Sequence, residues 1–177
     1  TSPQFYKQIM VGVFERVYTI GNVYRAEKHS TTRHLNEYTS LDMEMGFISD
    51  HRDIMAVETR LMHALIQQLR MNCEKEFKTL GAALPSAPKA FPSLKLREAQ
   101  ELIHKETKRD VRGEPDLDPE SERWLSAWAL TEHESDFLFI THYPMKKRPM
   151  YTFEDPEDPG YTRSFDLLLR GVEITTG

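Results

Sequence analysis

Residues 17–48 constrain the fold most, because two strand-like segments enclose a long and highly charged loop. Residues 17–24 are rich in β-branched and aromatic side chains, which fit a pleated, half-buried surface. Residues 38–48 alternate in places between apolar and polar side chains, as in a strand with two unlike faces. The intervening RAEKHSTTRHLNE holds two Arg, one Lys, two His and two Glu, and no apolar run. These features predict two strands joined by a polar loop.

Arg25 and Glu27 begin this loop, and because they are two residues apart they point to one face of an extended backbone. The planar guanidinium of Arg25 suits a phosphate or a carboxylate, and Glu27 can accept a hydrogen bond from an amine such as that of a base. Arg33 and His34 would reach a polyphosphate from the loop. On charge content alone, a solvated hairpin loop with weak surface ion pairs explains the segment better. The order of the residues is what favours a binding loop.

That order resembles motif 2 of the class II aminoacyl-tRNA synthetases, in which Arg-x-Glu is followed by a loop and then by Arg-His-Leu-x-Glu. The segment is similar to the aspartyl- and asparaginyl-tRNA synthetase subgroup in its archaeal and eukaryotic form. The resemblance extends to TSPQFYKQ at residues 1–8 and to RPMYTFEDPEDPGYTRSFDLLLRGVEITTG at residues 148–177. Three motifs in the same order span nearly the whole chain and are far more specific than one.

The resemblance implies an α+β fold, with a largely antiparallel sheet flanked by helices, and makes residues 1–177 part of one catalytic domain. Residues 17–48 would form motif 2, residues 51–132 a helical segment, and residues 136–177 the strands that bind substrate and metal. The family's motif 1, motif 3 and anticodon-binding domain are not found in these residues, so the chain by itself is expected to be inactive or nearly so.

The resemblance also implies a reaction. L-aspartate and ATP would form aspartyl-adenylate, and aspartate would then be transferred to tRNA, with Mg²⁺ as the cofactor. The full-length protein is expected to be a cytoplasmic homodimer with no membrane partner. Whether it also charges tRNA(Asn) stays open. Two alternatives remain, an asparaginyl-tRNA synthetase and a synthetase-like module that binds ATP or a partner without charging tRNA.

Most of the site residues that the resemblance implies lie in the first two motifs. Arg25 and Glu27 are the expected catalytic pair, with Arg25 on the α-phosphate and the substrate carboxylate and Glu27 on the adenine amine. Further residues expected at ATP are Ala26, Arg33, His34, Leu35 and Glu173. Residues expected at the amino acid are Gln4, Phe5, Tyr6, Lys7, Arg25 and Thr176. Lys7 suits a substrate with a second carboxylate, although core aromatics at Phe5 and Tyr6 and a surface charge at Lys7 are the simpler interpretation.

The last segment allows a geometric argument. Arg170-Gly171 fits a two-residue hairpin turn, because glycine supplies the positive φ that such turns need. Leu168 then pairs with Glu173. Asp166 is two residues from Leu168, so Asp166 and Glu173 fall diagonally on the same face. Two carboxylates placed in this way repel each other unless a cation lies between them.

In the resembled family these two positions bind a Mg²⁺ ion that bridges the ATP phosphates, and Thr176 stands where related enzymes carry a Ser near the metal. The expected metal ligands are therefore Asp166, Glu173 and Thr176, and the alternative is a pair of exposed acids at a sheet edge. The prediction also requires Arg25, Asp166 and Glu173 to line one cavity sized for a nucleotide.

The remaining pattern predicts a scaffold. Helices are expected at residues 3–14, 51–78, 94–107 and 119–132, a linker at 81–92, and strands at 136–141 and 150–153. Asp50 and Asp118 suit the N-caps of two of these helices. Trp124 and Trp128 lie at helical spacing, which favours core packing over base stacking.

Composition sets outer bounds on function. A net charge of −5 gives no global attraction for nucleic acid, so any RNA contact would come from a local patch. The single Cys73 excludes an internal disulfide and suits a reducing compartment. No apolar run approaches the roughly 20 residues of a membrane span. The chain has no glycine-rich phosphate loop and no Cys/His metal cluster, so ATP would bind through Arg and metal.

Overall fold

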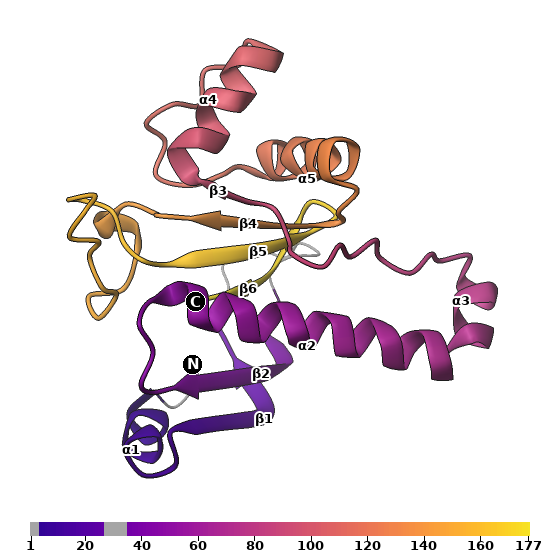
Figure 1. The fold of residues 1–177 in the computed structure, drawn as a ribbon, viewed down its shortest axis with the longest axis horizontal. Helices are drawn as coiled ribbons and strands as arrows, with labels where there is room; N and C mark the ends of the chain where they lie inside the picture. Colours follow the sequence, from indigo (N-terminus) through magenta and orange to yellow (C-terminus); the bar gives the residue numbers. More distant parts are fainter. Residues whose placement is uncertain (1–3, 27–34) are drawn as a thin grey trace. The chain divides into compact units, whose positions relative to one another are not determined.

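The computed structural model describes residues 4–26 and 35–177 and has the expected α+β fold (Figure 1). The chain divides into two compact units, Thr1–Ser49 and Asp50–Gly177, which we describe separately. Among the described residues, no helix is both long and apolar enough to cross a membrane.

The first unit is a helix followed by an antiparallel hairpin. Helix α1 spans Gln4–Phe14, and strands β1 (Arg16–Tyr24) and β2 (Glu37–Met45) pair along their whole lengths, from Arg16 opposite Met45 to Tyr24 opposite Glu37. Gly46 lets α1 approach the end of β2, because a Cβ there would lie 3.0 Å from Cγ1 of Val11. β2 ends at Met45 rather than near residue 48, since the Gly46 N–H bonds the Glu15 carbonyl and Phe47 has a φ of +55°.

The second unit is built on a four-stranded sheet in the order β3-β4-β5-β6. Its strands are β3 (Ser93–Lys95), β4 (Phe137–Thr141), β5 (Phe165–Leu169) and β6 (Val172–Thr176). β3 is parallel to β4, and the other neighbours are antiparallel. β4 is buried along its whole length, which explains why its sequence is a continuous apolar run rather than an alternating one.

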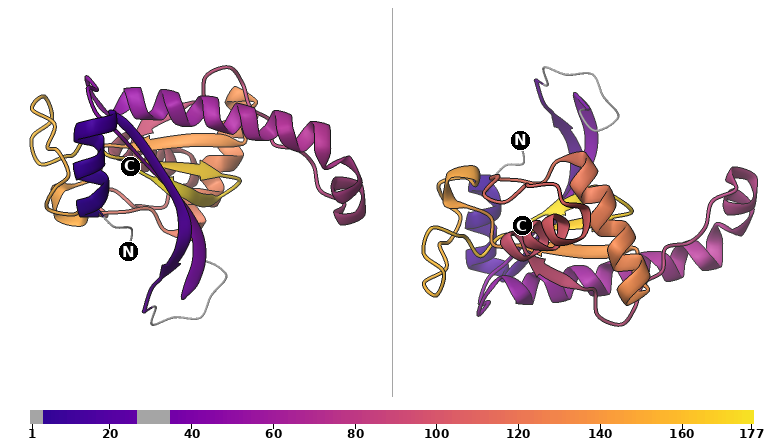
Figure 2. Two further views of the ribbon diagram at one scale, coloured as in Figure 1. Left: turned by 90° about the horizontal axis from the view of Figure 1, so that it is seen from below. Right: turned by 90° about the horizontal axis from the view of Figure 1, so that it is seen from above.

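Helices cover both faces of this sheet (Figures 1 and 2). On one face, Leu138, Ile140 and Leu168 pack with α4 (Leu96–Thr107) and α5 (Pro119–His133). On the other face, the phenylalanines of β4 and β5 and Leu167 pack with α2 (His51–Asn72). Alternate residues of β5 therefore belong to different cores, and Asp166 lies on the same face as Leu168.

Two predicted helix starts are confirmed. Asp50 caps α2 by accepting a 2.8 Å hydrogen bond from the Arg52 N–H, and Asp53 bonds back to the Asp50 N–H. Asp118 caps α5 by accepting a 2.7 Å hydrogen bond from the Ser121 N–H. Each cap satisfies a backbone donor that the helix itself cannot.

Three predicted elements differ from the structure. The expected helix 51–78 is broken at Cys73, whose φ of −123° ends α2 before α3 (Glu74–Leu80) begins. Leu94 is not helical, because it lies in β3 and pairs with Ile140 of β4, so the segment 51–132 is not wholly helical. Residues 150–153 form no strand, since the Thr152 N–H bonds the Pro149 carbonyl and closes a turn.

A buried core lies beneath α5 in the second unit. We expect Leu125→Ala to lower the free energy of unfolding by about 3 kcal/mol, because a fully buried leucine leaves a cavity when truncated. Leu130→Ala, on the same helix but 46% exposed, is the matched control and should cost less than about 1 kcal/mol. Urea unfolding of the whole protein measures both, and equal losses in the two variants would contradict this assignment of the core.

Candidate functional site

The turn between β5 and β6 has the predicted two-residue form. Arg170 and Gly171 have φ values of +50° and +84°, as a type I′ turn requires. A Cβ on Gly171 would lie 2.9 Å from Cα of Arg123, so no larger residue fits without movement. Leu169 pairs with Val172 and Leu168 with Glu173, which confirms the predicted register at the turn.

A β-bulge beyond the turn changes which threonine faces Asp166. Leu168 pairs with Glu173 but Leu167 pairs with Thr175, which leaves Ile174 as an extra residue on β6. Thr176 therefore stands opposite Asp166, whereas an unbroken ladder would put Thr175 there. The three predicted metal ligands consequently lie on one face of the hairpin, the face that carries Leu168.

The two carboxylates on this face disfavour each other's charge. Burial, acting together with the negative charges of Asp166 and Glu122, raises the pKa of Glu173 to about 7. Glu173 is nevertheless exposed to solvent, so protein atoms surround its carboxylate on one side but do not enclose it. Asp166 is only 4% exposed. A cation placed here would relieve the repulsion that the sequence predicts.

Arg148 also belongs to this site, although the sequence assigned it no role of its own. Its Nη2 lies 2.8 Å from Oδ1 of Asp166, and its Nη1 donates a 3.0 Å hydrogen bond to Oγ1 of Thr176. Its guanidinium carbon lies 3.9 Å from the centre of the Tyr143 ring. The only sequence signal for Arg148 was its presence in the RPMYT segment.

Lys7 forms a second charged centre, in the first unit. It is 8% exposed, so the interpretation of Lys7 as a surface charge is wrong. Its Nζ lies 2.7 Å from Oε1 of Glu44 and 3.9 Å from Oδ1 of Asp42, both on β2. The alternation of residues 38–48 places these two acids on one face, a signal that the sequence analysis did not use.

An open pocket of about 600 Å³ adjoins this lysine. Tyr6, Lys7, Met10 and Phe14 of α1 line it together with residues 16–19. Phe5 and Tyr6 are 68% exposed, so they are not core aromatics within this unit. The structure thus brings Tyr6 and Lys7 of the predicted amino-acid site to one pocket, and the side chain of Gln4 lies outside the described residues.

Three of the residues predicted at ATP follow or precede the paired strands at one end of the β1–β2 hairpin, and Glu173 lies in β6 of the other unit. Arg25, Ala26 and Leu35 are exposed there, and the Arg25 N–H extends the ladder by a 2.8 Å bond to the Asn36 carbonyl. The Arg25 guanidinium carbon lies 5.3 Å from the centre of the Tyr38 ring. Three further predicted residues, Glu27, Arg33 and His34, lie outside the described residues.

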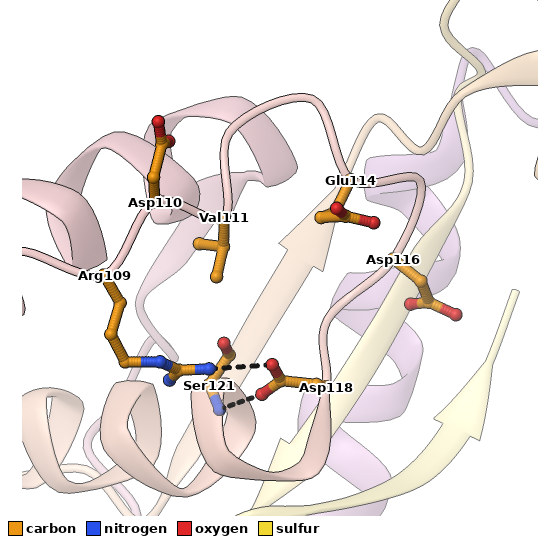
Figure 3. A pocket seen from close by; sticks show the side chains of 7 residues that line it. All are labelled: Arg109, Asp110, Val111, Glu114, Asp116, Asp118 and Ser121. Carbon is orange, nitrogen blue, oxygen red and sulfur yellow. Dashed lines mark hydrogen bonds and ion pairs between the residues drawn. The ribbon is translucent and has the colours of Figure 1, made fainter.

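A second pocket, of about 450 Å³, lies at the connection between α4 and α5 and was not predicted (Figure 3). Its polar groups serve local structure. Asp118 caps α5 through Ser121 and also accepts a 2.8 Å hydrogen bond from Arg109 (Figure 3). Because these charges already satisfy one another, we assign this pocket no role in binding.

A family model described as "tRNA synthetases class II (D, K and N)" matches residues 1–177. This chain belongs to the class II tRNA synthetases of that group. The match spans both compact units. It therefore includes the β5–β6 hairpin, the buried Lys7 and the exposed Arg25.

Named relatives agree with this family. An aspartate--tRNA(Asp/Asn) ligase of Deinococcus radiodurans is 49% identical, over 99% of this chain and 41% of the relative. An aspartate--tRNA(Asp) ligase of Pyrococcus abyssi is 40% identical, over 99% of this chain and 40% of the relative. The solved aspartyl tRNA synthetase from Entamoeba histolytica has a TM-score of 0.90 at 30% identity, over 99% of this chain and 37% of that one. The chain spans about two fifths of the length of these relatives.

The residues of the β5–β6 hairpin fit a magnesium ion better than a transition metal. Within residues 4–26 and 35–177, no group of three or more His, Cys, Asp and Glu side chains is arranged to hold a metal. Asp166 and Glu173 instead offer two carboxylates, with the Thr176 hydroxyl nearby. Mg²⁺ is commonly held by one or two carboxylates, with substrate phosphates and water completing its octahedron.

The raised pKa of Glu173 predicts a pH-dependent stability. In a magnesium-free buffer, Glu173 keeps its proton to a higher pH in the folded protein than in the unfolded chain. The stabilisation of the folded state by this proton is fully present below about pH 4.5 and is lost as the pH rises through about 7. We therefore expect the unfolding free energy of Glu173→Gln to gain on that of the wild type between pH 5 and 8. Glu132→Gln, at an exposed glutamate of α5, is the control. A difference that stays constant over this window would contradict the assignment.

Proposed function

We propose that the whole protein containing these residues activates L-aspartate with ATP to form aspartyl-adenylate and then transfers aspartate to tRNA. The observation that carries the proposal is the arrangement of Asp166, Glu173 and Thr176 on one face of the β5–β6 hairpin, which suits a cation and the phosphates it binds. The ligase names of relatives at 40% and 49% identity supply the amino acid and the tRNA.

The first step would be an in-line attack of the aspartate α-carboxylate oxygen on the α-phosphorus of ATP. A phosphorus–oxygen bond forms, the bond to the β-phosphate oxygen breaks, and pyrophosphate leaves with the electron pair. Positive groups accelerate this reaction by balancing charge on the phosphate oxygens and by aligning two anions that repel each other. Arg25 is suited to this role, because its planar guanidinium can contact the α-phosphate and the substrate carboxylate together.

Asp166, Glu173 and Thr176 would hold Mg²⁺, which when bound neutralises phosphate charge. The residues themselves account for the preference for a cation. Glu173 has a pKa near 7, so it gives up its proton most easily when positive charge arrives beside it. Loss of that proton leaves two carboxylates ready to ligate the ion.

Lys7 would recognise the side-chain carboxylate of aspartate. Its ammonium group is buried and held between Glu44 and Asp42, so its position is fixed before a substrate enters the adjoining pocket. A carboxylate gains an ion pair with Lys7, whereas the neutral amide of asparagine does not. The same acids on β2 are suited to the substrate's own ammonium group.

The proposal extends to partners outside these residues. We place tRNA binding mainly in the rest of the protein, because the described residues give no net positive charge for it. The full-length protein would act in the cytoplasm as a homodimer. Its choice between tRNA(Asp) alone and both tRNA(Asp) and tRNA(Asn) is a property of that remaining part.

Pyrophosphate exchange on the full-length protein tests the function. We expect ATP–pyrophosphate exchange with L-aspartate and little with L-asparagine, and Arg25→Gln should lower kcat/KM by about 100- to 1,000-fold, as for loss of one charge-stabilising donor. Arg52→Gln, at an exposed arginine paired only with the helix cap Asp50 in the described contacts, should behave like the wild type. Exchange driven by asparagine would support the alternative, an asparaginyl-tRNA synthetase, and no exchange with either would support a non-charging module.

Lys7 provides a separate test of substrate recognition. We expect Lys7→Met to raise the KM for aspartate at least about tenfold, because one charge-assisted interaction is lost. The KM for ATP should stay within about twofold in this variant. Lys78→Met is the control, since that lysine is exposed and, among the described residues, its ammonium group pairs only with Glu74 one helical turn away. Equal increases in both KM values for Lys7→Met would show a general structural defect and contradict the assignment.

A further inference from the structure

Arg148 occupies the position where a cation is expected. Its Nη2 is 2.8 Å from Oδ1 of Asp166, and its Nη1 bonds Oγ1 of Thr176 at 3.0 Å. These are two of the three predicted metal ligands, and the third, Glu173, lies on the same face of the hairpin. One guanidinium therefore contacts two of the three groups proposed to hold the ion.

The rest of the surroundings hold Arg148 in place. Its side chain is 15% exposed, and its guanidinium lies against the ring of Tyr143, 3.9 Å from the ring centre. Tyr143 is 2% exposed, and burial and the nearby charge of Asp166 both raise the pKa of its hydroxyl. The pair of Arg148 and Asp166 is thus a buried ion pair rather than a surface contact, and water screens it little.

The ion pair is nevertheless incompletely satisfied. Oδ1 of Asp166 and the Nε and Nη2 atoms of Arg148 are buried and have no well-aligned hydrogen bond among the described residues. A buried carboxylate oxygen that lacks such a bond gains more from a better ligand than a fully bonded one does. Charge is balanced here, but the coordination needs of the carboxylate are not met.

We propose that Arg148 is an internal counter-ion that competes with the divalent cation for Asp166, so that the ion displaces it on binding and its presence lowers the metal affinity of the site. This inference rests on the proposed metal site. Two effects act in the same direction: the guanidinium occupies one carboxylate oxygen, and its positive charge repels an incoming ion. In the absence of metal, Arg148 holds Asp166 in place through this ion pair.

Direct metal binding tests the inference without relying on activity. Mn²⁺ binding to the whole protein is measured by electron paramagnetic resonance of the free ion, without ATP. We expect Arg148→Gln to bind Mn²⁺ about tenfold more tightly than the wild type, a size typical of coupling between two charged ligands. Arg148→Lys keeps the charge but cannot reach Asp166 and Thr176 as a fork, so its affinity should be intermediate.

Arg97→Gln is a matched control. Arg97 also lies over a tyrosine ring, at 4.1 Å from the centre of Tyr161, and also pairs with an aspartate, Asp158. It does not contact Asp166, so its variant should bind Mn²⁺ as the wild type does. A tightening in Arg97→Gln equal to that in Arg148→Gln would reveal a nonspecific charge effect and overturn the proposal.

Glu173→Gln separates this inference from the proposed function. If that variant loses Mn²⁺ binding and Arg148→Gln tightens it, both the site and the competition are supported. If Glu173→Gln loses binding but Arg148→Gln binds equally or more weakly, the metal site stands and the competition is overturned. If neither the wild type nor Arg148→Gln binds Mn²⁺, both are overturned.

A measurement on the unmodified side chain covers the case in which Arg148→Gln does not fold. Arginine labelled with carbon-13 at the guanidinium gives one resonance for each residue, and Arg148→Lys identifies that of Arg148. Titration with Mg²⁺ should shift this resonance and leave that of Arg97 unchanged. An Arg148 resonance that does not respond to saturating Mg²⁺ would overturn displacement.

Discussion

The charge of Asp166 is the constraint on which the arrangement of the β5–β6 hairpin depends. An ionised carboxylate that is 4% exposed is costly unless a positive group or several hydrogen bonds accompany it. A second carboxylate, Glu173, lies on the same face, and burial together with the charge of Asp166 raises its pKa. Arg148 reduces the cost for Asp166, and the exposed side of Glu173 lets it take up a proton instead. The repulsion between the two acids is thus reduced by an ion pair at Asp166 and by protonation at Glu173.

In the first unit, a buried positive charge is likewise balanced by neighbouring groups of opposite charge. Lys7 is buried against β2 and is balanced by Glu44, with Asp42 farther away. Two acids around one lysine leave an excess of negative charge beside the pocket, which suits an amino-acid ammonium group. The negative β5–β6 hairpin therefore suits the metal ion that accompanies the ATP phosphates. Lys7 and its two acids suit the carboxylate and ammonium groups of an amino acid.

The features that were predicted correctly, a turn and two helix caps, are those that a few neighbouring residues determine. The Arg170-Gly171 turn followed from the φ requirement of two-residue hairpins, and Asp50 and Asp118 followed from the unpaired donors at helix starts. Residues 150–153 were assigned to a strand from their composition, but a strand also needs a hydrogen-bonded neighbour and Thr152 bonds within a turn instead. Composition shows what a strand tolerates and not whether a partner strand is present.

The parts of the site that sequence reasoning missed depend on contacts between distant residues. Arg148 meets Asp166 only because the loop after β4 returns to the sheet, and Lys7 meets Glu44 only because α1 packs on the β1–β2 hairpin. No periodicity links such pairs, although the acids of β2 were visible as alternate residues.

The bulge at Ile174 shows how a small irregularity determines which residue reaches a site. An unbroken ladder would place Thr175 opposite Asp166 and turn Thr176 toward the core beneath α2. With one extra residue, Thr176 faces Asp166 and Arg148, while Thr175 faces the α2 side and donates its hydroxyl hydrogen to the buried Glu58. Both threonines then have partners suited to a hydroxyl. Alternation in the sequence cannot reveal such an insertion, because the residues around it, Glu173 to Thr176, have no apolar pattern strong enough to mark a change of face.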